Sequence, residues 1–194
     1  MATTLLTAPG VEPITLTEAK AHMRIDHTAE DDTITEMIGA ARQALEDTSD
    51  LALIDQTWRV QLDAWPDRAA SGIVELPKRP TQSITAVRVT SMDGTQATLP
   101  TMAYELISAG GLARLVKTPT AIWPSPGRIA GGIEIDYVAG YGDAASYVPR
   151  ALRQALLMVI AHVYENRELL SRDSGTALPR GVEALLAPYK RVRL

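Results

Sequence analysis

The chain has 194 residues, of which 46% are hydrophobic and 22% charged, and its formal net charge is −4 at pH 7. A chain of this length buries enough apolar surface to fold without disulfides or metal ions. It contains no cysteine, which excludes disulfides, thiolate zinc sites, iron–sulfur clusters and a cysteine nucleophile. Its acidity argues against a protein that coats nucleic acid by charge alone.

The apolar residues form no run near the roughly 18 residues of a membrane span. Residues 1–11 lack the positive start and the long apolar core of a secretory signal, so we expect neither a signal nor a membrane partner. The three histidines, His22, His27 and His162, are scattered along the chain, which disfavours a histidine-rich metal site.

Charge is distributed unevenly along the chain. Residues 1–50 carry ten acids and three bases, residues 51–149 nine and eight, and residues 150–194 four and eight. An acidic head and a basic tail suit head-to-tail self-association or docking on an acidic partner. The two ends could equally neutralise each other within one fold, and the sequence alone leaves both interpretations open.

The first fifty residues carry two helical patterns. Thr15 and Glu18 form a capping box that predicts the start of a short helix. A second helix is predicted from Glu30 to Thr48, with apolar residues at helical spacing: Ile34, Met37, Ile38, Ala41 and Leu45. Its acidic first turn suits the positive end of the helix dipole, which explains these carboxylates more simply than a metal cluster.

Between residues 56 and 140 the hydrophobic period changes to two, which is typical of half-buried strands. Turns are predicted at Asp93-Gly94 and at Gly110-Gly111. Trp123, followed by Pro124, is either an exposed interaction residue or a cap of the sheet core. The predicted strands, which suit a compact antiparallel sheet or small sandwich, are 56–64, 73–76, 84–89, 104–107, 112–116 and 133–138.

Residues 143–194 return to helical patterns. Pro149 is predicted as the first residue of a long helix that ends near Leu170. A shorter helix runs from Pro179 to Pro188, and a basic tail follows. We therefore predict an α+β fold in which helical N- and C-terminal segments pack together with an inserted antiparallel β region. The expected organisation is one domain over 1–194, with helices at 1–50, a β region at 56–140, helices at 146–188 and a tail at 189–194.

Catalytic and ligand-binding motifs are weak. Gly140-Tyr141-Gly142 lacks the third glycine and the spacing of a dinucleotide loop, and no phosphate-binding loop or nucleophile elbow is present. His162 and Glu165 lie three residues apart on a predicted helix, a spacing that can place two ligands on one face. No second such pair exists, so we predict no catalytic, cofactor or metal site. Two alternatives remain. One is a small enzyme or a ligand- or metal-binding domain that uses His162 and Glu165, and the other is a weak nucleic-acid binder that uses the basic C-terminal tail.

Several motifs nevertheless follow one another in a specific order. They are Ile14–Asp26, Gln56–Val60, Leu76–Pro80, Ile84–Val87, Tyr137–Gly142, Val148–Pro149, Leu152–Ala155, His162–Glu168, Leu178–Pro179 and Val182–Tyr189. In this order they resemble the head–tail connector proteins of tailed bacteriophages, which also occur in prophages and gene transfer agents. The resemblance covers nearly the whole chain, and the ordered set is more specific than any one piece.

This resemblance implies a structural adaptor of the virion, without catalysis, at the head–tail junction and in the host cytoplasm during assembly. Such proteins form a ring of about twelve copies below the portal protein. The implied partners are the portal, other copies of the chain and a tail-side stopper or tail-completion protein. DNA passes through the channel without sequence-specific binding.

The resemblance supports only a helix-level assignment of contacts. The candidate subunit or portal interface comprises Arg150, Arg153, His162, Tyr164, Glu165, Arg167, Tyr189, Lys190, Arg191 and Arg193. A complementary acidic face on the neighbouring subunit comprises Glu30, Asp31, Asp32 and Glu36. The tail is expected to order when it docks on the portal.

Overall fold

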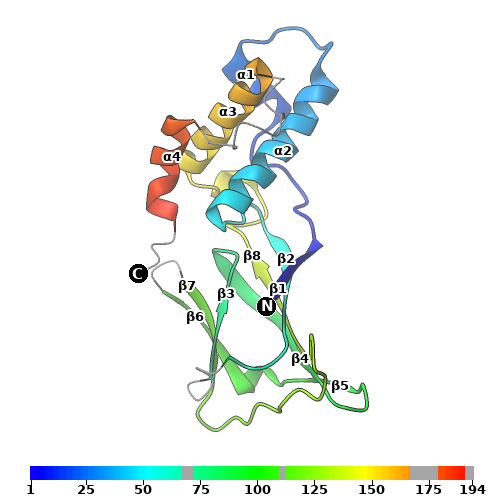
Figure 1. Cartoon of the computed structure of the whole chain (residues 1–194). Coiled ribbons are helices and arrows are strands. Elements are labelled where there is room, and N and C mark those ends of the chain that lie inside the picture. Colours follow the sequence, from blue (N-terminus) through cyan, green and yellow to red (C-terminus); the bar gives the residue numbers. More distant parts are fainter. Residues whose placement is uncertain (67–71, 110–111, 167–178, 191–194) are drawn as a thin grey trace. The chain divides into compact units, whose positions relative to one another are not determined.

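The computed structural model describes residues 1–66, 72–109, 112–166 and 179–190 (Figure 1). Contacts divide the chain into two compact units. The first, which we call the β unit, comprises residues 1–9 and 55–141, and the second, the helical unit, comprises residues 10–54 and 142–194. The expected single domain over 1–194 stays a prediction, and each unit is described by itself.

The helical unit joins the two ends of the sequence. Its helix α3 packs against α1, α2 and α4, so N- and C-terminal helices share one core, as predicted. The described helices are α1 (Leu16–Met23), α2 (Asp31–Ser49), α3 (Arg150–Glu165) and α4 (Arg180–Leu186), with 3-10 turns η3 (Ala145–Tyr147) and η4 (Ala187–Tyr189). None of the helices in this described part of the chain is long and apolar enough to cross a bilayer.

The buried side chains of this unit are the apolar stripes of the sequence. Fully buried positions on α2 and α3 include Ile34, Leu45, Leu152, Leu156 and Ile160, which recur at helical spacing. Helices with one apolar stripe are stable only when the stripes face one another. The chain therefore brings residues more than a hundred positions apart into one core.

The helix ends follow local chemistry. The capping box predicted at Thr15 is present, because the Thr15 hydroxyl accepts from the Glu18 amide and the Glu18 carboxylate accepts from the Thr15 amide. Pro149 precedes α3 as its N-cap and is not the first helical residue, a difference of one position. The predicted extension of this helix toward Leu170 lies outside the described residues.

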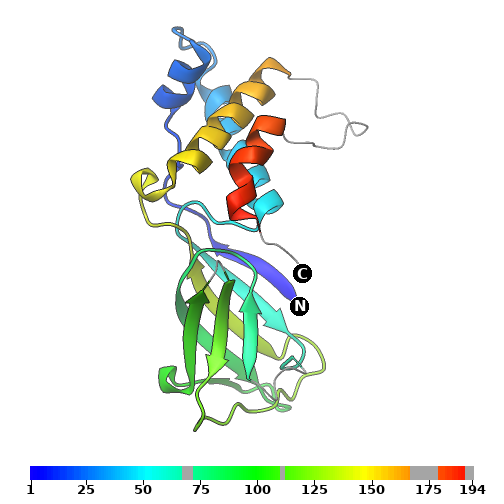
Figure 2. The same ribbon diagram turned by 90° about the vertical axis from the view of Figure 1, so that its left-hand side faces the viewer.

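The β unit contains two antiparallel sheets, the smaller of which lies across one face of the larger (Figure 2). The larger has the strand order β1-β2-β8-β4-β5 and the smaller the order β3-β7-β6. The turn predicted at Asp93-Gly94 joins the paired strands β4 and β5. Strands β6 and β7 also pair, and the turn predicted at Gly110-Gly111 lies outside the described residues. The strands are β1 (Ala2–Thr7), β2 (Gln56–Leu62), β3 (Ile73–Leu76), β4 (Thr81–Thr90), β5 (Gln96–Thr98), β6 (Tyr104–Ala109), β7 (Leu112–Lys117) and β8 (Ile133–Ala139), with a 3-10 turn η2 (Thr101–Ala103).

Alternation along the strands divides buried from exposed residues. Val60 of β2 and Ile133, Ile135 and Tyr137 of β8 are fully buried, and Leu115 of β7 is buried on the small sheet. Strand β1 was not predicted from the sequence. All six of its side chains are exposed, so its residues show no alternation that could indicate a buried face.

Several of the motifs that carry the resemblance contact one another in one corner of the β unit. Lys78 lies over the ring of Trp58, with 5.1 Å from Nζ to the ring centroid. The Lys78 amide donates to the Tyr137 hydroxyl over 3.3 Å, and the Gly140 amide donates to the Pro80 carbonyl over 2.8 Å. Burial raises the pKa of Tyr137 to about 12, so this hydroxyl stays protonated. The motifs that carry the resemblance are thus structural in this region.

In that corner the backbone of another segment approaches Gly140 so closely that a side chain there would clash with it, and we expect a replacement of Gly140 to lower stability. Its φ is +155°, and a Cβ there would lie 2.4 Å from the backbone nitrogen of Asp55. We expect Gly140→Ala to destabilise the protein by at least about 2 kcal/mol, measured by urea unfolding. Gly10→Ala is the control, because a Cβ there meets nothing within 4 Å, and it should cost no stability. Equal stability of the two variants would contradict this account.

Candidate functional site

Two residues of the predicted acidic face are engaged inside the helical unit. The Tyr164 hydroxyl of α3 donates a hydrogen bond to Glu30, the N-cap residue of α2. Lys20 of α1 forms an ion pair with Asp31, with 2.5 Å between Nζ and Oδ1. Glu30 and Tyr164 had been assigned to opposite sides of a contact between subunits, and the structure brings them together in one chain.

Arg153, a predicted interface residue, also has partners within its own unit. Its guanidinium donates to Glu18 and to the Pro13 carbonyl, and thereby ties α3 to the capping box of α1. The Thr15 amide lowers the pKa of Glu18 most, burial opposes this effect, and the Thr15 hydroxyl and Arg153 lower the pKa further. Glu18 therefore stays ionised at neutral pH and holds two helices together.

A second intra-unit network follows α2. Arg42 bonds to Glu12, which precedes α1, and to Glu46 one turn further along the helix. Glu46 is buried, and its other oxygen accepts from the Leu53 amide over 2.8 Å. A buried carboxylate is stable here because each of its two oxygens accepts a hydrogen bond. Sequence reasoning missed this network, because the i,i+4 spacing of Arg42 and Glu46 does not reveal that Glu46 is buried or that Glu12 also contacts Arg42.

Other charged residues of the predicted surfaces face solvent. Asp32 and Glu36 lie one turn apart on α2, and both are exposed. Arg150 at the start of α3 is exposed too, as are Glu165 and Lys190. Within the described part of the chain, none of these five side chains has a hydrogen bond or an ion pair. They are the charges that remain available to another molecule.

The remaining residues of the predicted interface differ from one another in burial and in contacts. His162 is half-buried, and its Nδ1 lies 3.3 Å from the Asn166 side-chain nitrogen at the end of α3. Tyr189 is half-buried in η4. No group of three histidines or carboxylates that could hold a metal occurs among the described residues. Arg167, Arg191 and Arg193 lie outside the described residues.

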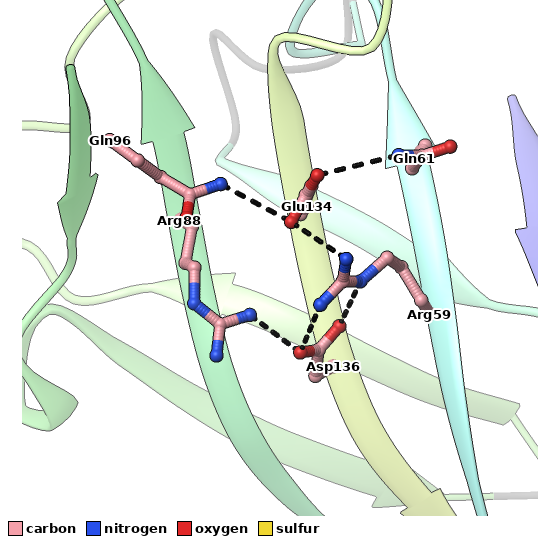
Figure 3. Close-up of polar contacts among 6 residues, drawn as sticks. All are labelled: Arg59, Gln61, Arg88, Gln96, Glu134 and Asp136. Atoms are coloured by element: carbon pink, nitrogen blue, oxygen red, sulfur yellow. Dashed lines mark hydrogen bonds and ion pairs between the residues drawn. The ribbon is translucent and has the colours of Figure 1, made fainter. Parts of the chain in front are cut away.

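The β unit carries a charged network on the outer face of its large sheet (Figure 3). Arg59 of β2 makes a bidentate contact with Asp136 of β8, with distances of 2.7 and 2.8 Å. Arg88 of β4 approaches the same carboxylate from the opposite side, at 2.5 Å. Glu134 extends the network, 3.1 Å from Arg59 and within hydrogen-bonding reach of Gln61 and Gln96.

This network lowers the pKa of Asp136, whose side chain is only 6% exposed. Burial alone would raise the pKa of Asp136, but hydrogen bonds from Arg59 and Arg88 outweigh burial and hold it below the ordinary value. The two arginines and two carboxylates cancel in charge, so the network links three strands without making a charged patch. Alternation in β2 and β8 predicted these polar positions, but not their pairing across strands.

Comparison with known proteins connects the chain to a specific assembly. The family model described as "Phage gp6-like head-tail connector protein" matches residues 13–98. Among curated proteins, no sequence is significantly similar to the chain.

Solved structures are similar over the full length of the chain. A chain in the structure titled "Neck of empty GTA particle computed with C6 symmetry" shares 28% identity with a TM-score of 0.83, and a chain of the virion of a native gene transfer agent (GTA) particle shares 28% with a TM-score of 0.82. A chain of the neck of the native GTA particle, computed with C12 symmetry, also shares 28%, with a TM-score of 0.75. Each alignment covers 100% of this chain and 97% of the other chain.

The Asp136 network makes a prediction about stability and pH. We expect Asp136→Asn to cost about 2 kcal/mol at pH 7, less than for a fully buried pair because both arginines remain partly exposed. The folded pKa of Asp136 lies below the unfolded value of about 3.9, so its contribution is full above that value and is lost as pH falls through the folded pKa. The difference between wild type and variant should therefore shrink from pH 6 to pH 3, measured by urea unfolding.

A matched control exists on the small sheet. Glu105 is also a strand carboxylate, on β6, but its side chain is exposed and has no hydrogen bond or ion pair in the described part of the chain. Glu105→Gln should change stability by less than about 0.5 kcal/mol. A loss from Asp136→Asn no larger than from Glu105→Gln would show that the network does not stabilise the sheet.

Proposed function

We propose, on the premise that the chain is a member of the phage head–tail connector family, that it assembles as a ring in the neck of a virus-like particle. The protein is a structural virion component located at the head–tail junction. The observation that carries this conclusion is its full-length similarity to chains of gene transfer agent necks, at 28% identity.

The ring requires a particular kind of interface. A rotationally symmetric ring closes through heterologous contacts, in which two different surfaces of each subunit meet those of its neighbours. The neck structures with C6 and C12 symmetry support a ring of about twelve copies, since a twelvefold ring also satisfies sixfold symmetry. A mildly acidic chain suits the wall of a channel, because DNA must pass without being held.

Lateral contact is proposed between the exposed charges of the helical unit. Asp32 and Glu36 of α2 would face Arg150 at the start of α3 of the neighbouring copy. Support comes from their exposure and from their lack of described partners, whereas Glu30, Asp31 and Arg153 are engaged within the chain. This narrows the acidic face proposed from the sequence to two residues.

Axial contacts are proposed with two different proteins. The portal protein would bind α3 and residues 189–194, where the basic tail supplies Lys190, Arg191 and Arg193 to an acidic surface. A tail-side stopper or tail-completion protein would bind the opposite face of the ring. We propose a structural role without catalysis, and the similarity to chains of particle necks supports it.

The first test is the mass of the protein in solution by light scattering, alone and mixed with the portal protein encoded beside it. We expect a ring-sized species, either alone or only with the portal, because weak lateral contacts can require a template. A variant lacking residues 191–194 should keep the melting temperature of the full chain and bind the portal at least tenfold more weakly. A monomer that ignores the portal would overturn the connector role, and unchanged portal affinity of the shortened chain would overturn only the role of the tail.

The lateral contact is tested by exchange of charge. Asp32→Lys with Glu36→Lys should reduce ring formation at least tenfold and reverse its salt dependence, because like charges then meet Arg150. Adding Arg150→Glu should restore much of the lost assembly, as a double-mutant cycle requires. Glu30→Gln is the control: it should lower monomer stability by about 1 kcal/mol through the Tyr164 bond and leave salt dependence unchanged. Failure of Arg150→Glu to restore the ring would exclude this pairing.

A further inference from the structure

One end of the β unit exposes large apolar side chains. Ile129 is 98% exposed, Met92 90%, Ile122 89% and Met102 81%, the highest values for large hydrophobic residues in the described chain. We call these four residues the apolar tip. Single exposed apolar residues need no explanation, but four in adjoining loops point to an interaction surface.

The loops that carry the apolar tip are bound to one another. They are the β4–β5 turn, η2 and the segment 118–132 before β8, at the end where β2 finishes and β8 begins (Figure 1). The Gly127 amide donates to the Thr90 carbonyl, and a Cβ at Gly127 would lie 2.0 Å from the Met92 nitrogen. The Thr118 hydroxyl donates to the Met102 carbonyl over 2.9 Å. Segment 118–132 thus joins both methionine-bearing turns.

Two tryptophans hold this segment in place. The rings of Trp65 and Trp123 lie 4.3 Å apart between centroids. The Trp65 indole donates to the Pro124 carbonyl and the Trp123 indole to the Ala103 carbonyl, over 2.8 and 3.1 Å. Trp123 is therefore a clamp, and the residue beside it, Ile122, is the one presented to solvent. A surface ordered before binding loses little conformational entropy when a partner docks.

Charge at this end is small and mostly satisfied locally. Asp63 accepts from the Gly131 amide, and Asp93 accepts from the amide and hydroxyl of Thr95. Arg128 is exposed. Among the described residues, these loops and the end of β2 therefore carry one base and two acids, which does not suit nucleic acid, and this surface differs from the charged surface of the helical unit. Its chemistry fits a protein partner with apolar pockets and few charges.

We propose that the apolar tip is the docking surface for the tail-side protein of the neck, through apolar pockets on that protein. The inference rests on the proposed function, which assigns the portal and the neighbouring copies to charged residues of the helical unit. The tail-side partner is thus left with a surface of different chemistry. In a ring, every subunit contributes one tip, so that contacts which are weak singly become strong together.

The test uses complete particles that carry Ile122→Asp together with Ile129→Asp. Both side chains are exposed, so the melting temperature should change little. We expect electron micrographs to show filled heads with a connector ring but without tails, and tailed particles to fall at least tenfold. Thr120→Asp together with Ser125→Asp is the matched control, because this pair adds the same two charges to exposed positions of the same segment without removing an apolar residue, and it should leave tailed particles at the wild-type number.

A second pair, Ile122→Gln with Met102→Gln, removes apolar contact without adding charge and should reduce tailed particles in the same direction. Normal numbers of tailed particles for both pairs would overturn the proposal. Heads that lack the ring would overturn it too, because the tip would then serve the portal or a neighbouring copy. Sedimentation of the wild-type protein with phosphatidylcholine vesicles, abolished by the same changes, would assign the tip to lipid instead. Particles that join heads to tails without this chain would instead refute the connector role itself.

Discussion

Strand β8 is the element on which the β unit depends, because it is the middle of the large sheet and uses both of its faces. Toward the interior it places Ile133, Ile135 and Tyr137, and on the outer face Glu134 and Asp136, of which Asp136 is buried among its arginine partners. The bidentate contact of Asp136 with Arg59, completed by Arg88, joins the three central strands across their outer face. A shift of register by one residue would move the carboxylates into the core, so this network and the core specify the same pairing.

In the helical unit the comparable constraint is the use of charge to bind helices together. Arg153, Lys20 and Tyr164 each bond to a carboxylate from the N-terminal segment. The acidic head and basic tail of the sequence thus meet in part within one subunit, the simpler of the two interpretations that the sequence left open. A smaller set of the predicted interface charges stays exposed, and the proposed lateral contact rests on this set.

Much of the fold could be predicted from local sequence. The capping box at Thr15, the apolar stripes of α2 and α3, and the alternation in β2 and β8 each reflect a periodicity that burial imposes. Strand β1 could not be predicted, because a strand with every side chain exposed has no such pattern. The partners of Arg153 and Glu30 could not be predicted from the sequence either, because each residue is more than 130 positions from its partner along the chain.

By itself, the sequence determined most of the helical and strand segments, the packing of N- and C-terminal helices with one another, and a resemblance to a connector family through motifs in a specific order. These follow from short-range periodicity and from residue types, which a linear reading contains. Only the tertiary structure decided which charges are engaged and which are free, that Trp123 is a clamp, and that Ile122, Ile129 and two methionines gather at one end of the β unit. The exposure of a side chain and its hydrogen-bonding or ion-pair partners depend on which distant segments come into contact, and this is decided only when the chain folds.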